Sequence, residues 1–274
     1  MEQTTNTNTE TPFRTPEEER EHQLKVEALN RRLLREEKEE KSGWKGIFWA
    51  IMLALAIRSL LFEPYNIPSS SMVPTLLVGD YLFITKFDYG YSRHSFPFSL
   101  PLIPRGRLLY NQPQRGDVVI FRKPPENSTD YIKRVIGLPG DTIQMRNGRL
   151  FINNQVVPRQ AKGQELWTTE LGEALYTRYS ETLPNGVVHD IYELTDENDY
   201  DNTEVFVVPT DSFFVMGDNR DNSLDSRAFG FVPAENLEGK ARLIFYSTNG
   251  NGWFFQFWRW KEFLRFERFF TDIK

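Results

Sequence analysis

The sequence contains no cysteine and only three histidines among its 274 residues. Without cysteine, the chain has no disulfides, no thiolate metal ligands and no cysteine nucleophile. His22, His94 and His189 are not spaced as metal ligands, and we expect all three at the surface or in loops. We therefore predict neither a metal site nor a cofactor. A hydrolase with this composition would need a general base other than histidine.

The chain also lacks a strong excess of charge of one sign. Its formal net charge is -5 at pH 7, which leaves no basic surface of the kind that binds nucleic acid. We therefore expect no nucleic-acid partner.

Charged residues dominate the N-terminal region, predicted as a cytoplasmic tail over residues 1–45. Residues 1–14 are rich in Thr and Asn, a composition typical of disorder. Thr15, Pro16 and Glu18 then predict a helix start with a capping box. The stretch 17–41 carries only a thin apolar stripe of Val26, Leu29 and Leu33. It is either a solvated helix or a helix that docks on a partner.

Long hydrophobic runs are absent except for one, "GIFWAIMLALAIRSLLF" at residues 46–62. Its 17 residues reach the lower limit for a membrane-spanning helix, and it is apolar on every face. A buried core helix or a cleaved signal peptide is a weaker interpretation, since the charged leader is too long for a signal peptide. We predict a transmembrane helix over 46–62.

The flanking charges predict the orientation of this helix. Six basic residues lie within 31–45, whereas residues 59–80 contain no Lys or Arg. Basic flanks stay on the cytoplasmic side. We expect a single-pass protein of the cell membrane with a cytoplasmic N-terminus and an exported domain.

Helical periodicity is nearly absent after residue 63, and short β-branched or aromatic runs replace it. Strands are predicted at 80–87, 117–123, 130–138, 148–157, 203–209, 212–217 and 241–247. The fold class is therefore mainly β, with an antiparallel catalytic domain over 63–250. Residues 158–204 are more polar and less regular, and we assign a β-rich insertion to about 148–204. The Gly-Asp pairs beginning at Gly79, Gly116, Gly140 and Gly217 predict turns.

The C-terminal segment, residues 251–274, combines many aromatic residues with Arg, Lys and Glu. It is either a wide core helix or a membrane-proximal segment at the lipid interface. We favour the second interpretation.

The stretch "PSSSMVPTLLVGD" places three serines between Pro68 and Pro74. Proline restricts its own φ and its neighbour's conformation, so the cluster is typical of positioned hydroxyls rather than of a linker. In "DYIKRVIGLPGD", strand alternation places Lys133 on one face with Tyr131 and Val135. Apolar surroundings lower the pKa of a lysine, which could then serve as the base for a serine nucleophile.

Four segments together resemble a known family. "PSSSMVPTLLVGDYL", "RGDVVIF", "DYIKRVIGLPGD" and "GDNRDNSLDSRAFGFVP" are similar, in order and spacing, to the conserved boxes of type I signal peptidases. These are membrane-anchored Ser/Lys endopeptidases that remove signal peptides from exported proteins. The resemblance covers roughly residues 58–245.

The resemblance implies a role for six residues of this chain. Ser71 would be the nucleophile and Lys133 the general base. The Ser69 hydroxyl and the Ser71 backbone N–H would form the oxyanion hole, and Ser223 would orient the lysine amine. Asp225 and Arg227 would form a supporting ion pair. Ser70 stands where many relatives have Gly.

The implied partners are preproteins bearing signal peptides, membrane lipid and the protein-export machinery. Two other interpretations remain open from the sequence. One is a self-cleaving Ser/Lys repressor protease of the same broad fold, and the other is a non-catalytic membrane-tethered β module that binds export substrates.

Overall fold

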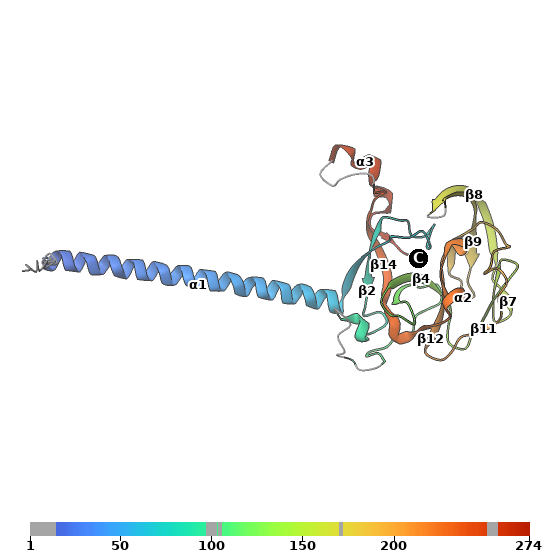
Figure 1. Ribbon diagram of the computed structural model, residues 1–274, viewed down its shortest axis with the longest axis horizontal. Helices are drawn as coiled ribbons and strands as arrows, with labels where there is room; N and C mark the ends of the chain where they lie inside the picture. Colours follow the sequence, from blue (N-terminus) through green and yellow to red (C-terminus); the bar gives the residue numbers. More distant parts are fainter. Residues whose placement is uncertain (1–14, 97–102, 104–105, 170–171, 251–256) are drawn as a thin grey trace, which may run out of the picture. The chain divides into compact units, whose positions relative to one another are not determined.

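The N-terminal element of the structure, a computed structural model, is helix α1 at Pro16–Leu60 (Figure 1). The structure describes residues 15–96, 103, 106–169, 172–250 and 257–274. The tail residues 1–14 and the segment 251–256, on which two of our sequence predictions partly fall, lie outside the described residues. The chain divides into two compact units, residues 1–55 and 56–274, and each is described by itself.

Helix α1 begins with the predicted capping box. Thr15 N donates to Glu18 Oε2 at 2.8 Å, and Glu18 N donates to Thr15 Oγ1 at 3.4 Å. Val26 and Leu29 of the predicted apolar stripe are exposed. The charged stretch and residues 46–60 of the apolar run form one continuous helix, whereas Phe62 begins strand β1 (Phe62–Asn66), so the helix ends before the predicted residue 62. Among the described residues, no helix is both long and apolar enough to cross a membrane.

An antiparallel sheet forms the centre of the second unit (Figure 1). Its strand order is β1-β2-β14-β3-β4-β12-β13, and β15 pairs with β14. The strands are β1 (Phe62–Asn66), β2 (Asp80–Thr85), β3 (Val118–Arg122), β4 (Asp130–Gly137), β12 (Ser212–Met216), β13 (Val232–Pro233), β14 (Leu237–Ser247) and β15 (Thr271–Asp272). The mainly β antiparallel class predicted from the sequence is confirmed.

Two smaller antiparallel sheets complete the unit. One has the order β11-β5-β6-β7, with β5 at Thr142–Arg146, β6 at Arg149–Ile152, β7 at Gln155–Val156 and β11 at Phe206–Val207. The other has the order β10-β9-β8, with β8 at Arg159–Thr169, β9 at Gly172–Thr182 and β10 at Val188–Glu193.

Two segments differ from the sequence predictions. Residues 148–157, predicted as one strand, form the β6–β7 hairpin, because Asn153 and Asn154 adopt positive φ values of 52° and 60° and turn the chain. Residues 158–204, predicted to be less regular, include two strands of 11 residues each, β8 and β9. Their side chains are mostly polar and partly exposed, so the apolar alternation that marks a half-buried strand is weak there.

The C-terminal segment does not form a wide core helix. Its helix α3, Trp260–Phe263, has only four residues. Phe263 and Leu264 are buried, whereas Trp258, Phe266 and Phe270 are exposed. The segment is joined to the central sheet by the β15–β14 pairing.

The core of the second unit determines where the reactive residues can lie. Strand β4 is flanked by β3 and β12, and its last six residues, from Ile132 to Gly137, are all buried. Ile132 packs in one apolar cluster with residues of β2 and β3, while Val135 packs in another with residues of β12. The side chain of Lys133, between Ile132 and Val135 on this strand, therefore lies next to apolar clusters.

Candidate active site

The serine cluster lies in the connection between β1 and β2. Ser71 is 9% exposed, and its carbonyl oxygen accepts a hydrogen bond from Asn219 N at 3.1 Å. Asn219 Nδ2 also donates to Ser70 O at 3.2 Å. The buried side chains of Met72 and Leu76, which follow the serines, pack in the same apolar cluster as β2 and β3. The loop is thus fixed from both sides, as the flanking prolines suggested.

Lys133 reaches the serine loop from β4. Its Nζ atom lies 2.6 Å from Ser71 Oγ and 3.0 Å from Ile132 O. Lys133 is only 3% exposed, and its amine lies 5.5 Å from the centroid of the Tyr131 ring. This contact agrees with the predicted shared face of the two side chains. The structure therefore brings together the two residues that the sequence singled out, 62 positions apart.

Burial lowers the pKa of Lys133 to about 8. The negative charges of Asp225 and Asp218 raise this pKa, but they offset only part of the effect of burial. At pH 7 a lysine with this pKa is about 10% neutral, compared with about 0.03% at the ordinary value. The environment thus increases the fraction of free amine by a factor of about 300. The amine becomes a usable proton acceptor near neutral pH.

An open cleft of about 510 Å³ leads to the two residues. Its walls combine apolar side chains of Ile67, Ile120 and Leu224 with the three serines of the loop. Ser69 Oγ lies 3.4 Å from Ser71 Oγ on this cleft. A hydroxyl in that position can donate to an oxyanion formed beside Ser71.

Ser223 is buried close to the two reactive residues, but within the described structure its hydroxyl has no hydrogen-bond partner. The bond to the Lys133 amine implied by the family resemblance is therefore not formed here. Ser223 remains a candidate for that role, since its hydroxyl and Ser71 O both lie against Gly217.

Gly217 lies where a side chain would not fit between Ser223 and Ser71. A Cβ atom there would lie 2.2 Å from Ser223 Oγ and 2.5 Å from Ser71 O. The other three Gly-Asp pairs do adopt the left-handed conformation expected of turns, with φ values of 88°, 97° and 86° for Gly79, Gly116 and Gly140. Gly217 has no positive φ, so close packing rather than a turn explains it.

Asp225 and Arg227 form an ion pair beside this glycine. Arg227 Nε and Nη2 each lie 2.9 Å from a carboxylate oxygen of Asp225. Gly217 N also donates to Asp225 Oδ2 at 3.0 Å. Burial would raise the pKa of Asp225, but the Arg227 guanidinium holds that pKa below its usual range. The pair fixes the end of β12 against the segment that carries Ser223.

A second buried ion pair, between Arg134 and Asp218, was not anticipated from the sequence. Arg134 Nε and Nη2 lie 2.8 and 2.7 Å from the two Asp218 oxygens, and both residues are fully buried. Thr75 Oγ1, at the end of the serine loop, donates to Asp218 Oδ2 at 2.6 Å. Strand alternation shows that the Arg134 side chain points away from Lys133. It does not show that the Arg134–Asp218 pair holds the serine loop through Thr75.

The predicted positions of two histidines are wrong. His94 and His189 are 6% and 5% exposed, and burial lowers the pKa of each to about 4. The nearest carboxylates to His189 Nε2 are Glu181 at 3.4 Å and Asp218 at 3.9 Å. His94 lies in a short polar segment and His189 in strand β10. The burial of both segments depends on residues far away in the sequence, so local sequence does not reveal it.

A buried lysine amine within hydrogen-bonding distance of a serine hydroxyl, beside a cleft in a mainly β domain, is an arrangement that suits a Ser/Lys hydrolase. The protein-family model described as "Signal peptidase, peptidase S26" matches residues 42–246. The chain belongs to this family. It is a serine peptidase, a signal peptidase that cleaves signal peptides from preproteins.

Curated relatives are similar in sequence to this chain along most of their length. The chain is 44% identical over 225 residues to "Signal peptidase I" of Rickettsia akari, covering 79% of this chain and 83% of that protein. It is 43% identical over 236 residues to "Signal peptidase I" of Rickettsia typhi, covering 82% and 87%. These matches set aside the repressor-protease and non-catalytic interpretations.

A solved structure of a signal peptidase I from Enterococcus faecalis also matches. It is 30% identical, covers 47% of this chain and 97% of that chain, and has a TM-score of 0.28. At that TM-score the superposition says nothing about the fold, and family membership follows from the sequence matches.

Proposed function

We propose that Ser71 is the nucleophile of signal-peptide cleavage and that Lys133 is its general base. The observation that carries this assignment is the 2.6 Å distance between Lys133 Nζ and Ser71 Oγ in a buried setting. The neutral amine accepts the Ser71 proton as Oγ attacks the scissile carbonyl carbon. The resulting ammonium donates this proton to the leaving amine of the mature protein. A water molecule then hydrolyses the acyl-serine, with Lys133 again as base.

The oxyanion hole of this proposal consists of the Ser69 hydroxyl and the Ser71 backbone N–H. The 3.4 Å separation of Ser69 Oγ and Ser71 Oγ supports it, because the Ser69 hydroxyl then lies beside the carbonyl group that Ser71 would attack. Asp225, Arg227 and Ser223 support the site from behind, through the contacts described at Gly217.

The pH dependence of kcat/KM tests the assignment of Lys133. Only the neutral amine can accept a proton, so kcat/KM should rise about tenfold per pH unit below the Lys133 pKa of about 8 and level off above it. The measurement is cleavage of a synthetic signal peptide by the full chain in detergent from pH 6 to pH 10. A plateau reached near pH 6.5, the ordinary pKa of histidine, would contradict the lysine base.

Ser69→Ala should lower kcat by about 10² to 10³, because it removes one oxyanion donor while leaving the Ser71–Lys133 contact intact. Ser70→Ala is the matched control. The Ser70 hydroxyl accepts from Asn222 Nδ2 at 2.7 Å, whereas the Lys133 amine lies against Ser71 Oγ. A silent Ser69→Ala combined with a severe Ser70→Ala would show that the roles within the triplet are assigned wrongly.

We also propose that the protein works at the membrane surface, with an N-terminal cytoplasmic tail and residues 46–62 in the bilayer. The apolar character of that stretch, in which Arg58 is the one charged residue, and the basic residues before it support the proposal. Trp258, Phe266 and Phe270 support a second lipid contact, since their side chains are 69%, 47% and 73% exposed. Preproteins would meet the cleft at this surface, delivered by the protein-export machinery.

Vesicle flotation should detect the second contact on its own. A chain lacking residues 1–62, and with them the whole predicted anchor, should float with vesicles that contain phosphatidylglycerol. Replacing Trp258, Phe266 and Phe270 by serine in the same chain should reduce the floated fraction several-fold. Recovery of the unsubstituted chain wholly in the soluble fraction would reject the lipid contact.

A further inference from the structure

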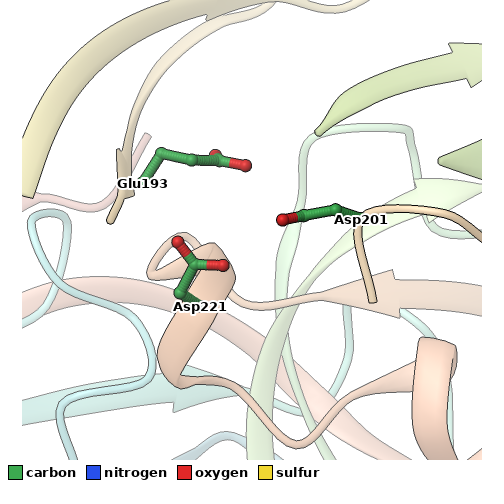
Figure 2. A group of neighbouring side chains, drawn as sticks. All are labelled: Glu193, Asp201 and Asp221. Atoms are coloured by element: carbon green, nitrogen blue, oxygen red, sulfur yellow. The ribbon is translucent and has the colours of Figure 1, made fainter. Parts of the chain in front are cut away.

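Three acidic side chains from distant parts of the sequence converge outside the active site. Glu193 ends β10, Asp201 lies in the connection that follows, and Asp221 belongs to the 3₁₀ helix η3 at Arg220–Asn222. One carboxylate oxygen from each lies within 4.8 Å of the others. Figure 2 shows the three carboxyl groups directed toward a common space.

Among the described residues, four carboxylate oxygens of this cluster lack a hydrogen-bond donor. Glu193 is 2% exposed and Asp201 is 0% exposed. Neither oxygen of Glu193 has a hydrogen-bond partner within the described structure, nor do Asp201 Oδ1 and Asp221 Oδ1. Buried carboxylates are normally hydrogen-bonded, paired with a cation or bound to a metal, because isolated burial of a charge is strongly unfavourable.

Backbone amides orient two of the acids. Asp201 Oδ2 accepts from Asn198 N at 2.7 Å, and Asp221 Oδ2 accepts from Thr195 N at 3.1 Å. In each residue the other oxygen, Oδ1, is left without a partner in the cluster. The two aspartates are therefore held in place, each with one free oxygen.

Arg159 does not satisfy Glu193. Its Nη1 atom lies 3.5 Å from Glu193 Oε2, beyond a good hydrogen bond, and donates instead to Gly148 O at 2.9 Å. Its Nη2 atom lies 2.7 and 2.9 Å from the two oxygens of Asp196. The charge of this arginine is thus largely committed to Asp196.

The other two nearby arginines are also committed elsewhere. Arg220 binds Glu181 through two nitrogens, and Arg227 binds Asp225 in the same manner. Their remaining nitrogens, Arg220 Nε and Arg227 Nη1, have no hydrogen-bond partner and so do not bond the cluster. The three arginines therefore leave these carboxyl oxygens without a hydrogen bond.

We propose that Glu193, Asp201 and Asp221 bind a calcium ion. Carboxylate oxygens are the ligands of hard divalent cations, and nitrogen or sulfur ligands are absent from the cluster. Oxygens that lie within 4.8 Å of one another can reach one ion at a Ca–O distance of roughly 2.4 Å. Mg²⁺ demands shorter distances, near 2.0–2.1 Å, and octahedral geometry. Asp221 is only partly buried, which gives the ion a route from solvent.

The bound ion would link the insertion to the catalytic loop. Glu193 and Asp201 belong to the predicted insertion, whereas Asp221 lies between Arg220 and Asn222 on η3. Asn222 Nδ2 donates to Ser70 Oγ at 2.7 Å, one residue from the proposed nucleophile. Calcium is thus expected to stabilise the segment that holds the serine loop, without touching the reacting atoms.

Thermal unfolding of the full chain in detergent tests the proposal. After treatment with EGTA and its removal by dialysis, added CaCl2 should raise Tm by about 2–5 °C, saturating at micromolar to millimolar concentration. MgCl2 at the same ionic strength should give a smaller shift. Isothermal titration calorimetry with CaCl2 should show one site per chain.

Glu193→Gln and Asp201→Asn should fold and lose both the calcium shift and the calorimetric signal. Asp199→Asn is the matched control, because Asp199 is an exposed acid of the same connection outside the cluster, and it should respond like the unsubstituted chain. The proposal is overturned if millimolar CaCl2 leaves Tm unchanged or if MgCl2 raises Tm by the same amount. It is also overturned if Glu193→Gln keeps the calcium-dependent rise in Tm. A loss of the response in Asp199→Asn would equally overturn the assignment of these three ligands.

Discussion

Replacing Lys133 with arginine should abolish signal-peptide cleavage at every pH, with a loss of about 10⁴ to 10⁶ in kcat/KM. Arginine preserves the positive charge and most of the length, but it does not lose its proton in proteins. The variant can therefore occupy the site without accepting the Ser71 proton. Cleavage by the full chain should be measured from pH 6 to pH 10, alongside circular dichroism to verify folding.

A structural role for the lysine charge would predict the opposite result. Among the described residues, Lys133 forms no salt bridge, so arginine has no carboxylate partner to satisfy in its place. Lys133→Met, which keeps the bulk without the charge, guards against misfolding from the larger guanidinium and should be equally inactive. Substantial cleavage by a folded Lys133→Arg protein would falsify the Ser/Lys pair.

Replacing Ser71 with alanine should cause a loss of similar size, about 10⁶ in kcat, because the acyl-enzyme can no longer form. The fold should persist, since the Ser71 hydroxyl lies near only Lys133 Nζ and Ser69 Oγ, while its backbone carbonyl keeps the bond from Asn219. The rate of preprotein processing and the Tm of the detergent-solubilised chain provide the two measurements.

Covalent labelling separates loss of the nucleophile from general damage to the site. A serine-directed acylating reagent should modify the unsubstituted chain once and fail to modify Ser71→Ala. Ser70→Ala should still be labelled, because the Ser70 hydroxyl bonds Asn222 rather than the base. Labelling of Ser71→Ala at the unsubstituted rate would place the nucleophile elsewhere.

Local sequence signals were sufficient for the strands and helix start that carry their own pattern. The capping box at Thr15 and Glu18 forms as predicted, and β2, β3, β4 and β12 lie within the predicted runs. Alternation along β4 placed Lys133 and Tyr131 on one face. These features depend on neighbours within a few residues, where backbone geometry fixes the outcome.

Other features required the chain to fold before they could be recognised. Ser223 lies beside the reactive pair, yet its hydroxyl makes no bond to Lys133. Gly217 has the sequence of a turn glycine but serves close packing against Ser71. Both outcomes depend on distances between β12 and the serine loop, which lie about 145 positions apart in the chain.

The sequence alone indicated the reaction class of this protein, because four short segments resemble, in order and spacing, the conserved boxes of type I signal peptidases. It also determined the mainly β character of the domain. Only the tertiary structure decided that Arg134 and Asp218 anchor the serine loop, and that Glu193, Asp201 and Asp221 converge. The physical reason is that burial and charge pairing arise from side chains far apart in sequence, whereas strand alternation and capping arise from residues that are adjacent.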